Sequence, residues 1–481
     1  MKYFIPATLD VEKLIRENPP IRIWKFSKEN LLYILHLITS IPATNKDLFL
    51  YKGFVPIYST ILQKKIKNYR DYLDYLIYTC KVLITDNWYV KGQKSKGYQF
   101  RTQYKGRTKM VNAEDRSLIA AINRESVFSI SMRKKYNHLC KWYTPEFEID
   151  RELAEEYTVI DYERKLANPE LRDYDEKKKR YIDPATQYNC SMLNIERIAE
   201  ADFKLSVDTN VFRLHSTISN LRSEIRNCIT WNGQQLVSID IKNSQPYLST
   251  VLLKPSFWCG GAQNLYFNNI FSINSISQSL PRIIFQSEER VGSFIMLSRS
   301  AATQTGGDVQ RYSTLVQQGG FYEYFQEQIG KELGIGYSDR RKVKAAVFQV
   351  LFTDNRFLAQ KEARPKRLFK ELFPMVYTLF SRIKQSDKTH LPRLLQRIES
   401  YLMLQVIAKR ISRERPQLPI FTIHDSIITT AGNEEYVQSV LLEEMAKAIG
   451  FPPKLSVEYW HPANLKFRNG DLFYGDERIA V

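Results

Sequence analysis

Cysteine is scarce in this sequence, and the few cysteines follow no familiar pairing pattern. The chain has 481 residues and five cysteines, an odd number at wide spacings without a C-x-x-C pair. Neither a disulfide framework nor a zinc site is therefore expected, and this usage fits the reducing cytoplasm. Apolar runs of transmembrane length and a signal-peptide pattern are also missing, so we expect no membrane partner.

Negative charge is the second scarcity. The sequence has 70 Lys and Arg against 52 Asp and Glu, which gives a formal net charge of +18. A basic surplus of this size favours a polyanionic partner, and nucleic acid is the commonest one. A bias toward solubility is the alternative. The length predicts two to four domains with room for a large core.

The first 109 residues combine helical patterns with a basic hairpin. The predicted helices and hairpin lie at 27–39, 59–66, 69–83 and 87–100, and Ser27 is placed to cap the first helix. Three helices and a hairpin resemble a winged helix-turn-helix module. We therefore expect residues 1–109 to form a nucleic-acid-binding domain.

The hairpin and its continuation carry the charge of this domain. From Lys91 to Lys109 there are seven Lys or Arg and no Asp or Glu, with three aromatic residues interleaved. Such a wing is suited to phosphate contacts, and a solvated hairpin on a packing domain is the equal alternative. The expected DNA-binding residues of the wing are Lys91, Lys94, Lys96, Arg101, Lys105 and Arg107.

The rest of the chain divides near residue 205. Residues 110–205 are predicted to be mainly helical, and the alternating charges over 148–181 indicate solvent-exposed helices. After about residue 205, strand-like runs alternate with long helical patterns. This alternation of strand-like and helical patterns predicts an α+β region.

Two strand-like runs each carry one carboxylate. The run "SIDIKNSQP" (238–246) contains Asp240, and "FTIHDSIITT" (421–430) holds His424-Asp425-Ser426 between apolar residues. Either motif alone is more often structural. On adjacent strands, however, two carboxylates would hold the two divalent metals that phosphoryl transfer uses. Oxygen ligands suit two Mg²⁺ ions, with Mn²⁺ as the substitute.

A helix predicted over 338–354, "SDRRKVKAAVFQVLFTD", supplies a third feature. Arg340, Lys344, Phe348 and Phe352 recur every four residues and form one stripe. Cations in a first helical turn oppose the helix dipole, whereas an anion bound there would reverse this cost. The pattern therefore indicates phosphate binding, and an amphipathic surface helix is the alternative.

These pieces resemble the polymerase domain of family A DNA polymerases and of the phage-type single-subunit RNA polymerases. The family's R-x-x-x-K-x-x-x-F-x-x-x-Y helix is similar to the stripe described above, with Phe352 in place of the last Tyr. Its first and third carboxylate motifs are similar to "SIDIKNSQP" and "TIHDSI". Its primer–template segment is similar to "FRLHSTISNLRSEIR" (212–226). The four motifs occur in the family's order over about residues 205–470.

The resemblance implies an α+β right-hand polymerase with palm, fingers and thumb behind the N-terminal winged-helix-like domain. It implies a thumb-like region over 110–205 and a palm over 206–481, with fingers inserted at about 255–390. Metal ligation is implied for Asp240, Asp425 and the Ile241 carbonyl. Catalysis is implied for Asp240, Asp425 and Lys344, nucleotide binding for Arg340, Lys344, Phe348, Phe352 and Gln245, and primer–template contact for Arg213, Ser216, Asn220, Arg226, His424 and Gln396.

The expected function is template-directed nucleotidyl transfer by a DNA polymerase without a proofreading exonuclease, acting on DNA primer–template and nucleoside triphosphates. Gln245 is as long as the Glu of the DNA polymerases, and Phe352 lacks the Tyr hydroxyl that favours ribose. Both features point to deoxynucleotides, whereas Ser426 is typical of the RNA polymerases. A single-subunit RNA polymerase or primase, a replication initiator with a non-catalytic palm and a template-independent transferase are the alternatives.

Overall fold

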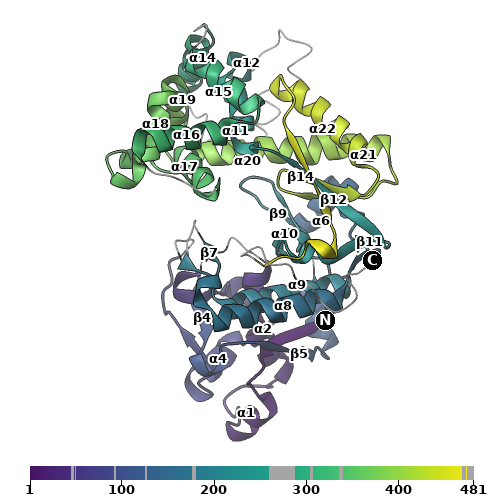
Figure 1. Cartoon of the computed structure of the whole chain (residues 1–481). Helices are drawn as coiled ribbons and strands as arrows, with labels where there is room; N and C mark the ends of the chain where they lie inside the picture. Colours follow the sequence, from purple (N-terminus) through teal and green to yellow (C-terminus); the bar gives the residue numbers. More distant parts are fainter. Residues whose placement is uncertain are drawn as a thin grey trace.

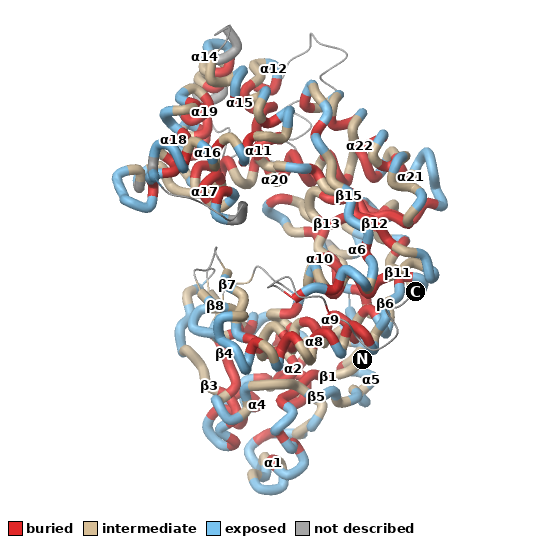
Figure 2. Tube along the Cα trace, viewed as in Figure 1, coloured by how far each residue is buried: buried red, intermediate tan, exposed pale blue. Residues whose placement is uncertain are grey.

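Two hydrophobic cores organise the chain. The computed structural model describes residues 1–44, 48, 50–91, 94–124, 127–175, 180–258, 288–303, 307–334, 340–467 and 473. The smaller core is built from residues between 3 and 118, and the larger from residues between 136 and 473 (Figure 2). A third cluster of Phe4, Ala43 and Leu193 links the N-terminal part of the chain to the rest.

The smaller core belongs to an N-terminal unit of helices and a three-stranded antiparallel sheet, at the bottom of Figure 1. The strand order in that sheet is β2-β4-β3, so the last strand in sequence lies in the middle. The elements of the unit are β1 (Lys2–Pro6), α1 (Val11–Glu17), α2 (Lys28–Thr44), β2 (Val55–Pro56), α3 (Ser59–Lys65), α4 (Tyr69–Asp74), the π-helical turn η2 (Tyr75–Thr79), β3 (Leu83–Thr85), β4 (Gly97–Phe100), β5 (Thr108–Asn112) and α5 (Arg116–Asn123).

Two details of this unit differ from the sequence prediction. The first strand of the hairpin is β3, not the stretch after Asn87, because Leu83 is fully buried whereas Trp88 and Tyr89 remain exposed. The unit also extends beyond residue 109. Strand β5 pairs with β1, and Leu118 of α5 is buried in the same core. The pairing of β5 and the burial of Leu118 therefore place both β5 and α5 in the N-terminal unit.

The region predicted as mainly helical contains one strand that belongs elsewhere. Its long helices are α8 (Arg151–Ala167) and α9 (Pro184–Ala199), which pack on each other, and α9 also packs on α2. Strand β6 (Phe147–Ile149), however, forms one edge of the large sheet. Residues before and after β6 contribute to the larger core. The helices thus connect the two units.

The large sheet has β12 at its centre. Its six strands are β6, β11 (Ile229–Trp231), β12 (Gln234–Ile241), β13 (Ile420–Ile423), β14 (Ser426–Thr430) and β15 (Leu455–Trp460). Both β14 and β15 pair antiparallel with β12, which explains why residues 236–239 are all buried. The Asn232-Gly233 turn before β12 has positive φ at both residues, as a two-residue hairpin requires.

Only helices are described between β12 and β13. They are α11 (Ser244–Ser249), α12 (Pro255–Trp258), α14 (Glu288–Thr303), α15 (Asp308–Gln317), α16 (Phe321–Leu333), α17 (Arg340–Phe352), α18 (Arg364–Leu372), α19 (Pro374–Ile383), α20 (His390–Tyr401) and α21 (Ala408–Glu414). Helix α22 (Glu434–Ile449) follows β14. Helices α14 to α19 lie at the upper left of Figure 1, whereas α21 lies at the right beside α22. Among the described helices, none is both long and apolar enough to cross a membrane.

An aromatic cluster couples the large sheet to the segment before it. The ring of Phe421 on β13 lies 4.8 Å from that of Phe147 on β6, 5.3 Å from that of Tyr143 and 5.6 Å from that of Trp231, centroid to centroid. Phe421 is fully buried. Aromatic rings at these separations stabilise the fold by more than the burial of their apolar area alone.

We therefore expect Phe421→Ala to lower the free energy of unfolding by about 3–5 kcal/mol, because it leaves a cavity in the aromatic cluster. Chemical denaturation followed by tryptophan fluorescence measures the change. The exposed Tyr58→Ala is the matched control and should change stability by less than about 0.5 kcal/mol. Equal effects of the two substitutions would contradict this account of the core.

Candidate active site

The strand register brings Asp240 and Asp425 together. Asp240 pairs with Ser426 across β12 and β14, so Asp425, the residue before Ser426, lies at the same end of the two strands. The Ser426 hydroxyl donates a hydrogen bond to Asp240 Oδ1. His424 and Asp425 form the two-residue turn between β13 and β14, and His424 has a left-handed φ of 54°. The turn therefore places both residues at the end of strands β13 and β14.

These two carboxylates repel each other in a partly buried setting. Burial raises the pKa of Asp240 to about 6, and the charges of Asp425 and Glu458 add to the rise. Burial also raises the pKa of Asp425. At Asp240 the charge of Arg226, and then that of Lys344, opposes the rise in pKa. At Asp425 hydrogen bonds oppose it first, followed by the charges of Arg213 and Lys344. Such a pair favours an additional cation.

Lys344 lies on the helical insertion, close enough for its charge to act on both carboxyl groups. It lies on α17, whose apolar face packs against α16, α18 and α20. The Lys344 Nζ lies 5.5 Å from the Phe348 ring, and the Phe348 and Phe352 rings are 5.0 Å apart. Half-buried Phe348 and Phe352 contact the larger core. Arg340 begins α17, but its side chain is outside the described part of the structure.

Glu399 connects two further candidates through one buried carboxylate. Arg213 donates to Glu399 Oε1 from Nε at 2.9 Å and from its terminal nitrogen at 2.5 Å. Gln245 Nε2 donates to Glu399 Oε2 at 2.6 Å. Burial raises the pKa of Glu399 to about 7, and Arg213 opposes the rise. The stretch "LLQRIES" (394–400) leads us to expect both Gln396 and Glu399 near the third motif. Glu399 makes these contacts, and Gln396 lies one helical turn away.

Glu399 is the single carboxylate of α20 and lies on its buried face, where an unpaired charge would be costly. Such a position indicates a specific partner. The sequence alone does not identify that partner, because Arg213 is 186 residues away.

The remaining primer–template candidates differ in how they are engaged within the protein. Ser216 is fully buried and caps α10 (Thr217–Asn220), so its hydroxyl is out of reach of a bound strand in this conformation. Asn220 Nδ2 donates to the Thr44 carbonyl at 3.1 Å, which ties this segment to α2. Arg226 donates to the Leu221 carbonyl at 3.2 Å, and its charge lowers the pKa of Asp240.

His424 faces a second histidine. The rings of His215 and His424 lie 6.4 Å apart in an edge-on arrangement. His215 Nε2 lies 3.6 Å from Asp208 Oδ2, and hydrogen bonds lower the pKa of Asp208 to about 2. The short strand β10 (Leu214–His215), which follows Arg213, thus brings His215 next to the β13–β14 turn.

The expected wing residues fall into two groups. Lys94 Nζ contacts Asp86 Oδ2 at 2.5 Å and lies 3.9 Å from the Trp88 ring, while Arg107 contacts Glu163 at 2.6 Å. These two cations are engaged within the protein. Lys91, Lys96 and Lys105 are exposed, and Arg101 is half-buried. The interleaved Tyr98 and Phe100 are core residues and are too buried to stack on bases.

The donor set at the strand ends fits a hard divalent cation only in part. Asp240 and Asp425 offer carboxylate oxygens, and Ile241 ends β12 beside them. No group of three or more His, Cys, Asp or Glu side chains is arranged as a metal site within the described ranges. Two carboxylates that repel each other can hold Mg²⁺ when water and phosphate oxygens complete its shell. The residues present therefore fit the ion together with a phosphate substrate.

Comparisons with known proteins leave the function to be argued from these residues. No family model matches the chain, and no curated protein matches it. Among solved structures, one match is the "POL domain of Pol1 from M. smegmatis complex with DNA primer-template and dNTP". It covers 72% of this chain and 71% of its own, at 14% identity and a TM-score of 0.35. A likeness at that level carries no functional argument.

The repulsion between Asp240 and Asp425 makes a prediction about stability. In chelator-containing buffer at neutral pH, Asp240→Asn should raise the free energy of unfolding by about 1 kcal/mol, because it removes one of two like charges. Urea denaturation measures the change.

The control is Asp161→Asn, which removes a buried carboxylate that contacts Lys165 Nζ at 2.6 Å and also pairs with Arg222. It should destabilise the protein by about 3–5 kcal/mol. If Asp240→Asn destabilised the protein as Asp161→Asn does, Asp240 would be a structural partner and not a metal ligand.

Proposed function

We propose that this chain is a nucleotidyltransferase that extends a nucleic acid strand at Asp240 and Asp425, and specifically a template-directed DNA polymerase. One observation carries the proposal. Lys344, from an insertion between the two strands, acts electrostatically on both carboxylates, which come from segments 185 residues apart (425 − 240). An anion-binding lysine facing a carboxylate pair is the minimum needed to hold a nucleoside triphosphate with its metal ions.

In this proposal the large sheet belongs to the palm, the helices from α12 to α19 are the fingers, and the long helices α8 and α9 before the sheet act as the thumb. The order of helices and strands in the N-terminal unit, with strand order β2-β4-β3, supports a winged-helix-like domain. Its exposed lysines and the charge of +18 favour a DNA partner. The domain boundary proposed from the cores lies after α5.

Asp240, Asp425 and the Ile241 carbonyl would hold the divalent ions. When bound, Mg²⁺ lowers the pKa of the attacking 3′-hydroxyl and offsets the charge that develops at the α-phosphate. Lys344 donates to the triphosphate and stabilises the leaving pyrophosphate, with Arg340 on the same helix face. Phe348 and Phe352 provide an apolar wall for the base.

Glu399 is a positioning residue in this scheme. It holds Arg213, proposed to contact the primer–template, and Gln245, proposed to lie beneath the sugar, in fixed orientations. A Gln245 side chain fixed in this way blocks a 2′-hydroxyl better than a mobile one. Deoxynucleotides are therefore the proposed substrates.

A ribonucleotide-using enzyme is the second candidate, and one observation favours it. Ser426 donates to Asp240 at the position where the DNA polymerases of the resembled family have Glu. The same chemistry on ribonucleotides would make the chain an RNA polymerase or primase. Supplying deoxy- and ribonucleotides separately distinguishes the two candidates.

Labelled-primer extension with Mg²⁺ tests the proposed reaction. Wild type should add nucleotides that the template specifies, whereas Asp240→Ala and Asp425→Ala should each lose most of the rate, because the two ligands act as a unit. Glu458→Gln, which removes an exposed carboxylate near Asp240 on β15, should retain most of the rate. Normal extension by either Asp variant would disprove the assignment.

The contact between Gln245 and Glu399 makes a prediction about sugar selection. Wild type should prefer deoxynucleotides about ten- to hundredfold in kcat/KM, and Gln245→Ala should erode that preference. Glu399→Gln should erode it as well, because Gln245 loses its carboxylate acceptor. The double variant should show no further loss.

A purely structural role for Glu399 would reduce kcat/KM for both sugars equally. That result, or additive effects in the double variant, would contradict the positioning role. Asp161→Asn again serves as the control, because it removes a buried carboxylate that has no contact with Gln245. It should leave the sugar preference unchanged.

The exposed lysines of the wing make a prediction about DNA binding. Replacing Lys91, Lys96 and Lys105 together with Gln should lower duplex DNA affinity and reduce the log–log salt slope by about 0.9 for each phosphate that the protein no longer neutralises. Lys94→Gln is the control, because Lys94 is engaged by Asp86 and Trp88. An unchanged slope in the triple variant would mean that the wing is a packing element.

A further inference from the structure

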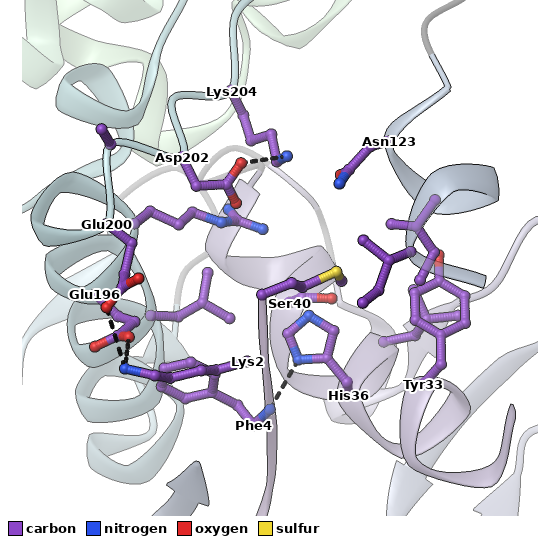
Figure 3. Close-up of a pocket in the computed structure, with 17 residues that line it drawn as sticks. Lys2, Phe4, Tyr33, His36, Ser40, Asn123, Glu196, Glu200, Asp202 and Lys204 are labelled. Atoms are coloured by element: carbon purple, nitrogen blue, oxygen red, sulfur yellow. Dashed lines mark hydrogen bonds and ion pairs between the residues drawn. The ribbon is translucent and has the colours of Figure 1, made fainter. Parts of the chain in front are cut away.

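A cavity of about 400 Å³ lies far along the chain from Asp240, between the N-terminal unit and α9 (Figure 3). Strand β1 and helices α2 and α5 line it on one side, and α9 with the segment to Lys204 lines it on the other. This volume is within the range of small-ligand sites. The walls include apolar and aromatic side chains, among them Phe4, Tyr33, Leu37, Ile119, Ile122 and Leu193.

The charges around the cavity separate into two ends. At one end Lys2 pairs with Glu196 and Glu200, and Arg151 pairs with Glu196 at 2.7 Å, so these charges balance. Figure 3 shows Lys2 with its two carboxylates on the side away from Asn123. This end needs no ligand.

Positive charge is in excess at the other end. Lys204 contacts Asp202 at 2.6 Å, and in Figure 3 its amine reaches toward Asn123. Arg197 lines the cavity and makes no ion pair among the described residues, although the charge of Asp202 acts on it. Lys65 Nζ, behind the wall, contacts the Tyr33 hydroxyl at 3.1 Å and the Ile122 carbonyl. Two lining cations, Arg197 and Lys204, thus share one nearby carboxylate, Asp202.

The charges of Lys204 and Arg197 change the pKa values of neighbouring groups. Burial, and then the charge of Lys204, lowers the pKa of Lys65. Burial lowers the pKa of Arg197. His36 accepts from the Phe4 amide through Nδ1 at 3.0 Å, and burial followed by the charge of Arg197 lowers its pKa to about 3. His36 is therefore neutral and keeps an Nε2–H donor.

We infer that this cavity binds a phosphate group, with Arg197 and Lys204 as its main contacts and the apolar walls around the attached sugar or base. Phosphate is an anion that suits a guanidinium and an ammonium group lining the same cavity. The group belongs to the 5′-phosphorylated end of a nucleic acid strand or to a free nucleotide. This inference does not depend on the proposed polymerase reaction, because it concerns binding at a separate place.

Binding measurements with the full chain test the inference. By fluorescence anisotropy, a 5′-phosphorylated oligonucleotide should bind about tenfold tighter than the same strand with a 5′-hydroxyl. Arg197→Gln should remove that preference. Lys204→Gln, a change at an exposed residue that should not disturb folding, should reduce it too. Arg151→Gln, which removes a cation already paired with Glu155 and Glu196, should preserve it.

Thermal unfolding in the presence of adenosine monophosphate tells whether the cavity binds a free nucleotide or a strand end. If the monophosphate raises the Tm of wild type but not of Arg197→Gln, while the two oligonucleotides bind equally, the cavity takes a free nucleotide. Inorganic phosphate, tested in the same Tm assay, shows how much of the binding comes from the phosphate group and how much from the apolar walls. The inference is overturned if neither the strand end nor the nucleotide shows binding that depends on Arg197 or Lys204.

Discussion

The antiparallel register between β12 and β14 is the constraint on which the candidate site depends. Because side chains alternate along a strand, a slip of one residue would turn Asp240 to the opposite face and separate it from the β13–β14 turn. Residues 236–239 are buried between β14 and β15, and the tight Asn232-Gly233 turn fixes the pairing of β12 with β11 on the path to these strands. The aromatic cluster around Phe421 holds β13 against the same sheet. Packing remote from the carboxylates therefore determines their position.

The charges at the site are arranged at the expense of stability. Asp240 and Asp425 repel each other, and Glu399 is buried with Arg213 as its cationic partner. Natural folds retain such arrangements where function requires them. Lys344 and Arg213 balance the carboxylates only in part, since the pKa values of Asp240 and Glu399 remain raised. A phosphate substrate with its metal ions would complete the balance.

The sequence predicted the parts of the site that lie on regular elements. Carboxylates in strand-like runs and a four-residue stripe on a helix are local patterns, and the structure has Asp240 beside Ser426 and Lys344 in line with Phe348. The side-chain partners of these residues could not be predicted from local patterns. The stretch "LLQRIES" (394–400) suggests Gln396 and Glu399 near the third motif, but the contacts of Glu399 with Arg213 and Gln245 join segments more than 150 residues apart. Burial likewise could not be predicted for Tyr98 and Phe100, which lie among basic residues in the sequence but belong to the smaller core on strand β4.

Manganese binding followed by electron paramagnetic resonance tests the central claim most directly. Titrated in the presence of a non-hydrolysable deoxynucleoside triphosphate, wild type should bind two Mn²⁺ ions close enough for their spins to couple, about 3.5–4 Å apart. The double variant Asp240→Asn with Asp425→Asn should bind neither ion tightly. Unchanged Mn²⁺ binding and coupling in that variant would contradict the claim that these two carboxylates form the catalytic metal centre.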